Sequence, residues 1–588
     1  MNLIRIFVVI LIINFHANLG AQKFNANWVL GYSINNGPDS SFGRLNVDFS
    51  EGKFIASKTN RVRHTMDFTN ASISDSLGNL LFYTNGLEVY NRLFKVMPNG
   101  DTLNPGFSAD RNEDGGYTLV GGALILPWPD NTDKYMLLHT TIDVTVNIPP
   151  ILWEWYSLNL LSTVIDINLQ NGFGDVVFKN KSVFTDSIVS GTLNACKHAN
   201  GRDWWINILR YDGTKMFTFL FDPSGISLYK SQYLNKELVK SNVGQCVYSK
   251  KGDKLAIFMT NDANIKEFLL FDFNRINGEL KQLEYGIDSN YQNTGVAFSN
   301  SGEYLYATTG TKLYQLNMNE SAPWATKFLI DTVDGAYYNR KYATHFAQML
   351  LALDGKIYIS AGRGSKQLSV IENPDQKGKL CNFKQFEIPL TMYNTCIPNF
   401  PNYNLGPIDG SICDTLGIDN IPWAWWRHEQ DSTDYLNIQF TDLSNYEVVE
   451  WEWSFGDGMI STIQNPIHHY TKNGSYEVCL IAKNKNGSDT LSKILNIGTS
   501  SVENLKTPIN IDLFPNPCDE YIIINVLDYI PEKMVIKLYD LFGNEILSRR
   551  LFEGSNVVNV ESIHKGIYFA NINEAGKKII SQKLIIYK

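Results

Sequence analysis

No block of basic residues occurs in this sequence. Its 588 residues include 51 Lys and Arg against 60 Asp and Glu, and the formal net charge of −9 is spread along the chain. Binding to nucleic-acid phosphates needs clustered Lys and Arg, which are missing here. We therefore expect no nucleic-acid partner.

The sequence also lacks the short motifs of several enzyme classes. It has no G-x-S-x-G, no H-E-x-x-H, no Walker loop and no repeated Asp-box of the sialidase type. Its seven cysteines include no C-x-x-C, so neither a zinc site nor a thioredoxin-like site is supported. We expect a protein without a cofactor.

Long apolar runs are absent beyond the N-terminus. There, an apolar run from Ile6 to Ile13 follows Arg5, small residues come next, and Ala21 is a suitable cleavage position before Gln22. The run is shorter than the roughly 20 apolar residues that cross a bilayer. We expect a signal peptide over residues 1–21 and no transmembrane segment, with an N-terminal buried strand as the alternative.

Export would place the seven cysteines in an oxidising compartment, where disulfides form. Cys396 and Cys413 bracket the turn-rich stretch IPNFPNYNLGPIDGSI, which could close as a loop, so they are the first candidates for a disulfide. Cys196 and Cys246 form a second candidate pair. The odd count leaves at least one thiol unless two chains cross-link.

Aromatic side chains, in contrast, are abundant. They make up 13% of a chain that is 44% hydrophobic and 19% charged, which is an ordinary globular composition that favours β structure. Helical periodicity is nearly absent between residues 64 and 389, which disfavours a solenoid of helix pairs. The length indicates three or four domains.

The middle of the chain repeats one pattern, in which a polar turn ending in Gly precedes a short strand of β-branched and aromatic residues. A sixth copy, PDNTDKYMLL, lacks the glycine. From Gly201 onward the spacing is about fifty residues, a period typical of β-propeller blades, which cannot bury their faces alone. The five complete copies contain Gly78, Gly201, Gly252, Gly302 and Gly355.

Each repeat reads as four short strands. Between Gln245 and Gly286, for example, GQCVYS, KLAIFMT, EFLLFDF and LKQLEYG are separated by turn residues. Six such units are visible, and a seventh would join NWVLGYS, GRLNVDF and KFIAS to CIPNF, closing the ring. We predict an all-β fold with a seven-bladed propeller over residues 24–406, with six or eight blades as alternatives. The pattern resembles secreted propellers of the kelch and WD-repeat-like kind, at the level of the fold only.

Two sets of propeller residues are candidates for function. His and carboxylate groups gathered at one mouth of the ring would suit a hydrolase or a lyase. Tryptophans could stack on sugar rings or on peptide side chains, but buried packing is the competing interpretation. In a strand, Trp204 and Trp205 would point to opposite faces. The catalytic candidates are His64, Asp67, His139, His198, Arg202, Asp203, His345 and Arg363; the other two tryptophans considered for ligand stacking are Trp153 and Trp155.

The fifty-residue repeat does not continue beyond residue 406. Residues 407–422 are rich in turn formers and read as a linker. In residues 423–498, apolar and polar side chains alternate along the stretches LNIQFTDL, VEWEWSF, SYEVCLIA and SKILNIG. This pattern is typical of the strands of a small β-sandwich.

This segment resembles the polycystic kidney disease (PKD) domain. It has the pattern W-x-F-G-D-G, then N-P-x-H-x-Y, then G-x-Y-x-V-x-L-x-x-x-N-x-x-G. The resemblance implies an Ig-like sandwich that serves as a spacer or a binding module and has no chemistry of its own. The matching residues are Trp453, Phe455, Gly456, Asp457, Gly458, Asn465, Pro466, His468, Tyr470, Gly474, Tyr476, Val478, Leu480, Asn484 and Gly487.

Asp457 is the residue here that most resembles an active-site acid. Asp-Gly between two strands is also a favoured hairpin signal, and we prefer that interpretation. Calcium binding would need several further oxygen ligands, and only Asp442 and Asp489 stand out. Zinc is disfavoured, because the adjacent His468 and His469 point to opposite faces of a strand and no third ligand is apparent.

Residues 505–588 resemble the type A C-terminal sorting domain of the type IX secretion system. They contain LFPNP, then IKLYDLFG, then GIY, then a closing KLII. The resemblance implies the type IX secretion machinery as a partner, with passage through the periplasm to a secreted or surface-attached state. A plain Ig-like domain is the alternative. The matching residues are Pro515, Asn516, Pro517, Tyr539, Asp540, Gly543, Gly566, Tyr568 and Lys583.

Together these features favour a non-catalytic secreted or cell-surface protein. Its propeller would be a platform that binds extracellular glycan or protein, with the PKD domain as spacer. The alternative is an extracellular hydrolase or lyase that acts on polysaccharide or peptide at the propeller mouth. A filled mouth would favour binding, and clustered carboxylates or a His, Tyr and Arg group would favour the enzyme.

Overall fold

A computed structural model describes most of the chain, and the predicted signal peptide, residues 1–21, lies outside the described part. The described residues are 23–31, 43–58, 66, 68–112, 115–142, 157–234, 241–261, 265–288, 294–333, 337–338, 342–362, 364–431, 433–497, 510–527, 534–551, 554–574 and 577–587.

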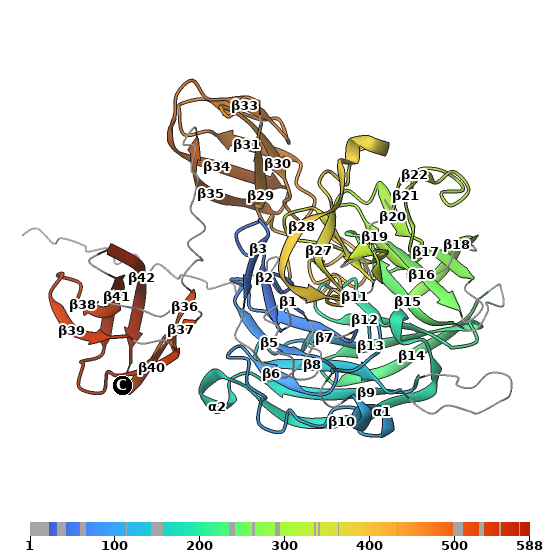
Figure 1. Ribbon diagram of the computed structural model, residues 1–588, viewed down its shortest axis with the longest axis horizontal. Helices are drawn as coiled ribbons and strands as arrows, with labels where there is room; N and C mark the ends of the chain where they lie inside the picture. Colours follow the sequence, from blue (N-terminus) through green and yellow to red (C-terminus); the bar gives the residue numbers. More distant parts are fainter. Residues whose placement is uncertain are drawn as a thin grey trace, which may run out of the picture.

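Seven antiparallel sheets surround one axis and form a propeller (Figure 1). The first strands of neighbouring sheets contact one another along much of the inside of the ring. The prediction of an all-β fold with a seven-bladed propeller is therefore confirmed. The first three sheets are β1 (Asn27–Leu30), β2 (Leu45–Asp48) and β3 (Ile55–Lys58); β4 (Ala71–Ser74), β5 (Leu80–Thr84) and β6 (Val89–Asn91); and β7 (Ala123–Pro127), β8 (Lys134–Thr140), β9 (Ser157–Asp166) and β10 (Asp175–Ile188).

The other four sheets have four strands each. They are β11 (Asn194–Lys197), β12 (Trp204–Leu209), β13 (Lys215–Asp222) and β14 (Gly225–Tyr233); β15 (Ser241–Tyr248), β16 (Lys254–Asn261), β17 (Lys266–Asn274) and β18 (Glu279–Asp288); β19 (Gly295–Phe298), β20 (Tyr304–Thr308), β21 (Lys312–Asn317) and β22 (Phe328–Thr332); and β25 (Phe346–Leu351), β26 (Ile357–Ala361), β27 (Ser365–Ile371) and β28 (Phe383–Asn394). Smaller elements are the pair β23 (Tyr337–Tyr338) and β24 (Tyr342–Ala343), helices α1 (Phe107–Arg111) and α2 (Leu169–Gly172), and the 3-10 turns Ser190–Thr192 and Gly378–Cys381.

The repeated glycines lie in the turns that follow the first strand of a sheet. Gly252, between β15 and β16, has φ +68°, and its N–H donates to the Ser249 carbonyl oxygen at 2.9 Å. A side chain is strained at such a φ, so glycine recurs in these turns. In the sixth copy, which has no glycine, Asp130 takes a positive φ of 65°. We call the ring face that carries these turns, at Gly78, Gly201, Gly252, Gly302 and Gly355, the hairpin face.

The first and last sheets meet by side-chain packing. Phe54 stacks on Tyr358 with 5.3 Å between ring centroids, and Trp28 meets the same ring edge-on at 5.8 Å. The prediction that CIPNF (Cys396–Phe400) would pair with the first sheet is wrong, because that sheet has the order β1-β2-β3 and CIPNF forms no strand.

Residues 395–407 instead run along the axis inside the ring, and we call them the axial segment. The Asn399 amide N–H donates to the Asn70 carbonyl oxygen, just before β4, at 2.9 Å. Farther along, the Asn402 N–H donates to the Ala195 oxygen of β11 at 2.9 Å, and the Tyr403 hydroxyl donates to the Ile125 oxygen of β7 at 2.8 Å. The axial segment therefore bonds to the inner parts of several sheets and fills the space between them.

Two β-sandwiches follow the propeller, as predicted. The first has sheets β29-β30-β33 and β32-β31-β34-β35, and the second has sheets β36-β37-β40 and β39-β38-β41-β42. The first comprises β29 (Trp426–Gln430), β30 (Asn437–Asp442), β31 (Glu450–Ser454), β32 (Ile460–Ser461), β33 (Ile467–His469), β34 (Gly474–Asn484) and β35 (Gly487–Ile497). The second comprises β36 (Asn510–Phe514), β37 (Tyr521–Leu527), β38 (Met534–Tyr539), β39 (Glu545–Arg550), β40 (Gly554–Asn559), β41 (Gly566–Glu574) and β42 (Lys577–Ile586).

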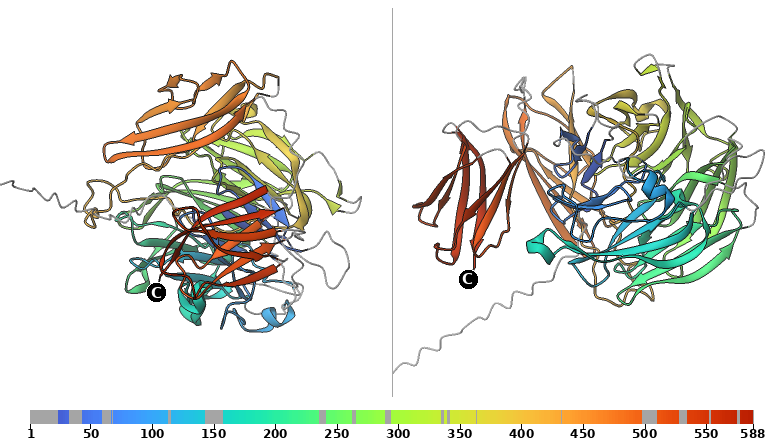
Figure 2. Two further views of the ribbon diagram at one scale, coloured as in Figure 1. Left: turned by 90° about the vertical axis from the view of Figure 1, so that its left-hand side faces the viewer. Right: turned by 60° about the horizontal axis from the view of Figure 1, so that its bottom comes forward.

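The first sandwich packs against the hairpin face (Figure 1, Figure 2). Trp425 donates its indole N–H to the Leu353 carbonyl oxygen at 2.8 Å, and Arg427 donates to the Asp354 oxygen at 2.7 Å. A Cβ added to Gly355 would come within 2.4 Å of Leu443. This close fit places the sandwich over the end of the ring where the axial segment emerges.

Candidate functional site

His139, one of the catalytic candidates, is a core residue. It is fully buried on β8, with Nδ1 2.7 Å from Asn104 Oδ1 and Nε2 2.9 Å from Thr163 Oγ1. Burial lowers its pKa to about 3, so the ring stays neutral over the physiological range. Both ring nitrogens are engaged, which suits a structural role.

His198, Arg202 and Asp203 lie together in the turn between β11 and β12. Arg202 Nε is 2.7 Å from Asp203 Oδ1, and His198 Nδ1 accepts the Asn200 N–H at 3.1 Å. The His198 ring packs against Trp205, with 5.1 Å between centroids. These side chains bind one another and the backbone of their own turn.

His345 does not join this cluster. His345 is a buried residue that precedes β25, in the sheet next to the first one. His64, Asp67 and Arg363 lie outside the described residues, as do Trp153 and Trp155. The three described histidines among the catalytic candidates, His139, His198 and His345, thus belong to three different blades.

Trp204 and Trp205 point to opposite faces of their blade, as strand alternation predicts. Trp204 donates its indole N–H to the Pro127 oxygen at 3.1 Å, and Trp205 donates to the Arg275 oxygen at 2.7 Å. Both are almost completely buried, since a blade is covered by a neighbour on each face. Neither indole is exposed for ligand stacking.

The expected disulfides are not formed. Cys396 lies inside the ring with its sulfur 3.5 Å from the Met66 carbonyl oxygen, whereas Cys413 is half-buried in the linker. Cys396 is therefore held in the core of the ring, which the linker loop does not enter. Cys196 and Cys246 share one buried cluster but are also separate thiols.

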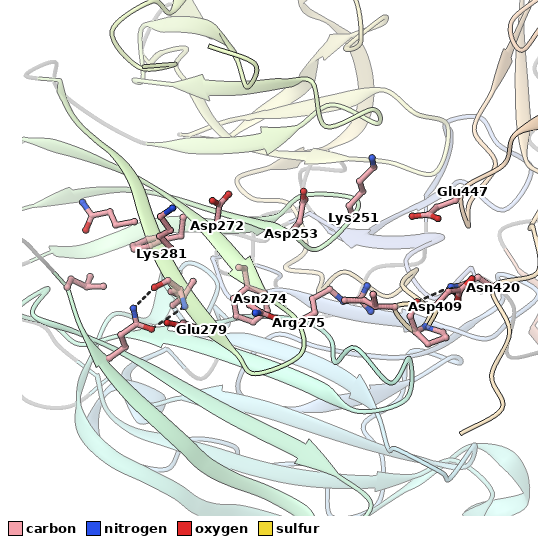
Figure 3. Close-up of a pocket in the computed structure, with 18 of the residues that line it drawn as sticks. Lys251, Asp253, Asp272, Asn274, Arg275, Glu279, Lys281, Asp409, Asn420 and Glu447 are labelled. Carbon is pink, nitrogen blue, oxygen red and sulfur yellow. Dashed lines mark hydrogen bonds between the residues drawn. The ribbon is translucent and has the colours of Figure 1, made fainter. Parts of the chain in front are cut away.

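A concave surface lies where the propeller, the linker and the first sandwich meet. A cleft of about 1,020 Å³, the charged cleft, is lined by β14, β17, β18 and the β15–β16 turn, with Asp409 and Asn420 from the linker and Glu447 and Lys485 from the sandwich. In Figure 3, Lys281, Asp272, Asp253 and Lys251 follow one side, and Glu279, Arg275 and Asp409 follow the other.

Part of this charge is engaged within the protein. Lys254 pairs with Asp272 at 2.9 Å, and Lys485 pairs with Asp409 at 3.1 Å. Burial alone would raise the pKa of Asp409, but hydrogen bonds from Asn486 and Lys485 outweigh it and hold that pKa below its usual value. Lys251, Lys281, Glu279 and Glu447 are exposed around the cleft.

Arg275 fixes the base of the charged cleft. Its Nε donates to the Lys197 oxygen at 2.8 Å, and its Nη2 donates to the His198 oxygen at 3.1 Å and to the Gly406 oxygen. The guanidinium therefore ties two blades to the end of the axial segment. Sequence reasoning missed this residue, since no local motif marks an arginine that caps carbonyl groups from distant turns.

A second cleft of about 740 Å³ adjoins the first and shares Lys251, Arg275, Pro407, Asn420 and Glu447 with it. Nine of the 28 residues that line it are Asn or Gln, so we call it the amide cleft. Together the two clefts form one groove along the junction of propeller and sandwich.

The Asp457 loop is a hairpin, as its sequence suggests. Trp453 and Phe455 are buried, and Asp457 accepts the Met459 N–H at 3.0 Å. Asp442 accepts from the Trp451 indole at 2.8 Å, and Asp489 accepts from the Ala424 amide at 2.8 Å. Among the described residues, no group of three His, Cys, Asp or Glu side chains could hold a metal ion.

The motif residues of the last sandwich connect its ends. Asn516 donates to the Lys583 oxygen at 2.6 Å and accepts the Ile585 N–H at 2.9 Å, joining the LFPNP segment to β42. Asp540 accepts the N–H groups of Phe542 and Asn544 in the turn that contains Gly543.

Each of the two sandwiches matches a known protein family. Residues 427–498 match the family described as PKD domain, and residues 512–587 match the secretion system C-terminal sorting domain. The chain thus carries a PKD domain and a type IX sorting domain behind its propeller. The sorting domain makes it a secreted or outer-surface protein. No described helix is long and apolar enough to cross a membrane.

Individual relatives are similar over limited parts. The collagenase ColQ1 of Bacillus cereus is 45% identical over 47 residues, which are 8% of this chain and 5% of the collagenase. The PKD1 domain of the Vibrio cholerae metalloprotease PrtV is 30% identical and covers 13% of this chain and 96% of its own, with a TM-score of 0.12. A structure of a putative 6-phosphogluconolactonase from Bacteroides fragilis is 10% identical and covers 63% of this chain and 96% of its own, with a TM-score of 0.37.

Proposed function

We propose that this secreted protein is a non-catalytic binding protein, and that it takes an extracellular polymer in the groove between its propeller and its PKD domain. The observation that carries the proposal is the axial segment, which fills the centre of the ring. The charged and amide clefts offer a concave surface outside the filled ring.

The axial segment leaves little space for a small substrate. Asn399 donates its side-chain N–H groups to the Ala123 and Leu193 oxygens, both at 3.1 Å, and so bridges two blades from within. A channel filled and hydrogen-bonded in this way favours binding at the rim over chemistry at the axis.

The composition of the charged cleft also favours binding. Its described lining contains no His, Ser or Cys, and therefore no Ser–His or Cys–His pair of nucleophile and base. Two of its carboxylates, Asp272 and Asp409, are held in ion pairs with Lys254 and Lys485. Exposed groups of both signs, such as Lys281 and Glu279, suit several weak contacts along an extended ligand. Such contacts give specificity and fast association.

A binding assay with the purified secreted protein tests the proposal. The protein is applied to arrays of glycans and extracellular-matrix proteins, beside a polysaccharide-release assay. Charge reversal at Lys251→Glu with Lys281→Glu should weaken the binding at least tenfold. The control, Lys377→Glu with Lys472→Glu, changes the net charge equally at exposed sites outside the groove and should bind normally.

Two results would contradict the proposal. Oligosaccharide release that survives purification to homogeneity would show a hydrolase or a lyase. Binding that neither groove charge reversal nor substitution in the amide cleft affects would place the ligand elsewhere on the protein.

A further inference from the structure

The amide cleft has a composition that suits one class of ligand. It lies between the hairpin face, the end of the axial segment and the PKD domain, and its volume of about 740 Å³ is in the usual range of ligand pockets. Its amide groups come from all three parts, with Asn300 and Gln376 from blades, Asn404 from the axial segment, and Gln439 and Asn465 from the PKD domain.

Several of these amides keep hydrogen-bonding capacity. Asn300 Oδ1 accepts from Lys250 Nζ at 3.0 Å, and its NH2 group donates to no described residue. Asn465 Oδ1 accepts the Asp442 N–H at 2.7 Å, which likewise leaves its NH2 group available among the described contacts. Asn404 is half-buried, and its side-chain NH2 group has no hydrogen-bond partner among the described contacts. A ligand that both donates and accepts would satisfy these groups.

An aromatic side chain lies in the same wall. Trp451 is half-buried, and its indole N–H donates to Asp442 Oδ2 at 2.8 Å. Asp442 Oδ2 also accepts from the Gln464 side chain at 3.1 Å, so the carboxylate holds both groups in place. The ring is thus positioned in advance, which reduces the entropy lost on binding.

These features favour carbohydrate over protein. Each sugar hydroxyl is a donor and an acceptor, as is each amide side chain, whereas a protein ligand is anchored by large side chains in apolar pockets. The two leucines of the lining, Leu405 and Leu443, are almost completely buried. Charged Lys251 and Glu447 lie where the amide cleft passes into the charged cleft.

We propose that the amide cleft binds a neutral oligosaccharide segment, with Asn300, Gln376, Asn404 and Asn465 as hydrogen-bonding residues and Trp451 as an aromatic contact. This inference rests on the proposed function, since it names the ligand class for one part of the same groove.

Calorimetric titration of the secreted full-length protein tests the inference. The probes are hexasaccharides of β-glucan, α-glucan, xylan and mannan, an oligogalacturonate as the acidic probe, and gelatin as the protein probe. At least one neutral hexasaccharide should bind with an affinity that hardly changes between 0.1 and 0.5 M salt, because no charge pair is involved.

Variants then locate the site. Asn300→Ala and Gln376→Ala should each weaken binding of that hexasaccharide about three- to tenfold, the usual effect of one lost hydrogen bond. Trp451→Phe keeps a ring and should bind better than Trp451→Ala. The control, Asn319→Ala, removes an exposed amide outside both clefts and should bind normally. Circular dichroism checks the fold of each variant.

The outcomes separate this inference from the proposed function. Gelatin or oligogalacturonate binding that depends on Lys251 and Lys281, with no neutral hexasaccharide bound, would overturn the carbohydrate assignment and keep the groove as the binding site. Neutral hexasaccharide binding that Asn300→Ala, Gln376→Ala and the lysine charge reversals all leave unchanged would overturn both.

Discussion

Nε2 of His468 lies 2.8 Å from Oδ2 of Asp457. The His468 ring also stacks on Phe455, with 4.1 Å between centroids and 3° between the ring planes. One histidine therefore joins the hairpin tip of the PKD domain to its buried aromatic core. Asp457, which looks like an active-site acid in the sequence, is held as a structural residue.

Loss of this contact should weaken the PKD domain in a pH-dependent way. Burial alone would raise the pKa of Asp457, but hydrogen bonds from the Met459 amide and His468 outweigh it and lower the pKa. The carboxylate therefore stabilises the fold above the pKa of about 3.9 that it has in the unfolded chain, and this contribution disappears as the pH falls through the lower folded value.

Asp457→Ala should accordingly cost about 1 kcal/mol of unfolding free energy at pH 7 and much less near pH 2.5. Urea unfolding at both pH values, followed by Trp fluorescence, measures the difference. An equal cost at both values would show that the ionised carboxylate is not the stabilising group.

The PKD domain should unfold together with the propeller. The Nζ atoms of Lys23 and Lys493 lie 4.7 and 4.6 Å from the ring centroid of Trp425, which packs on the hairpin face. Trp425→Ala removes this contact and should cost about 3–5 kcal/mol. Calorimetry should show one transition shared by the propeller and the PKD domain in the wild type and two separate ones in the variant, beside any transition of the sorting domain, whereas Tyr435→Ala, at an exposed PKD position, should keep the shared transition. Separate transitions of the propeller and the PKD domain in the wild type would argue against a fixed junction.

The axial segment should contribute to the stability of the ring. Tyr403 is buried and donates its hydroxyl to the Ile125 oxygen, so Tyr403→Phe should cost about 0.5–1.5 kcal/mol. Asn399→Leu removes bonds to two blades and should cost more. Guanidinium midpoints measure both effects. Midpoints at the wild-type value would mean that residues 395–407 are not part of the folded core.

The sequence predicted the propeller and both sandwiches because these folds have strong local signals. Turn glycines such as Gly252 and Gly302 recur at one period, and the Asp457 motif lies inside a long family pattern. The groove was not predictable in the same way. Arg275, Asn420 and Glu447 are far apart in the sequence and come together only through docking of the PKD domain on the hairpin face.

The path of CIPNF shows a second limit. Closure of the ring predicts a strand there, but Asn399 and the nearby Tyr403 donate to carbonyl groups inside the ring instead. Likewise His139 has the residue type of a catalyst, and only the buried partners Asn104 and Thr163 reveal that it belongs to the core.

His139 should make the propeller sensitive to acid. Burial lowers its pKa to about 3, whereas the unfolded chain has an ordinary histidine pKa of about 6.5. At pH values between these two pKa values, His139 is protonated in the unfolded chain but not in the folded protein. The free energy of unfolding therefore falls as the pH falls, by up to about 1.4 kcal/mol per pH unit. Above about pH 6.5 both states are neutral and the effect disappears.

Substitution isolates this contribution. His139→Gln should be less stable than the wild type at pH 7.5, because it replaces an imidazole that bonds to Asn104 and Thr163. The difference between the two proteins should shrink at pH 5.5 and again at pH 4.5, since only the wild type loses stability through residue 139. His428, whose pKa burial lowers to about 4, and Asp354, whose pKa burial raises to about 6, titrate in both proteins and cancel in the difference. Urea unfolding at the three pH values measures the difference in unfolding free energy between the two proteins. A difference that stays constant would mean that His139 is protonated in the folded protein as readily as in the unfolded chain.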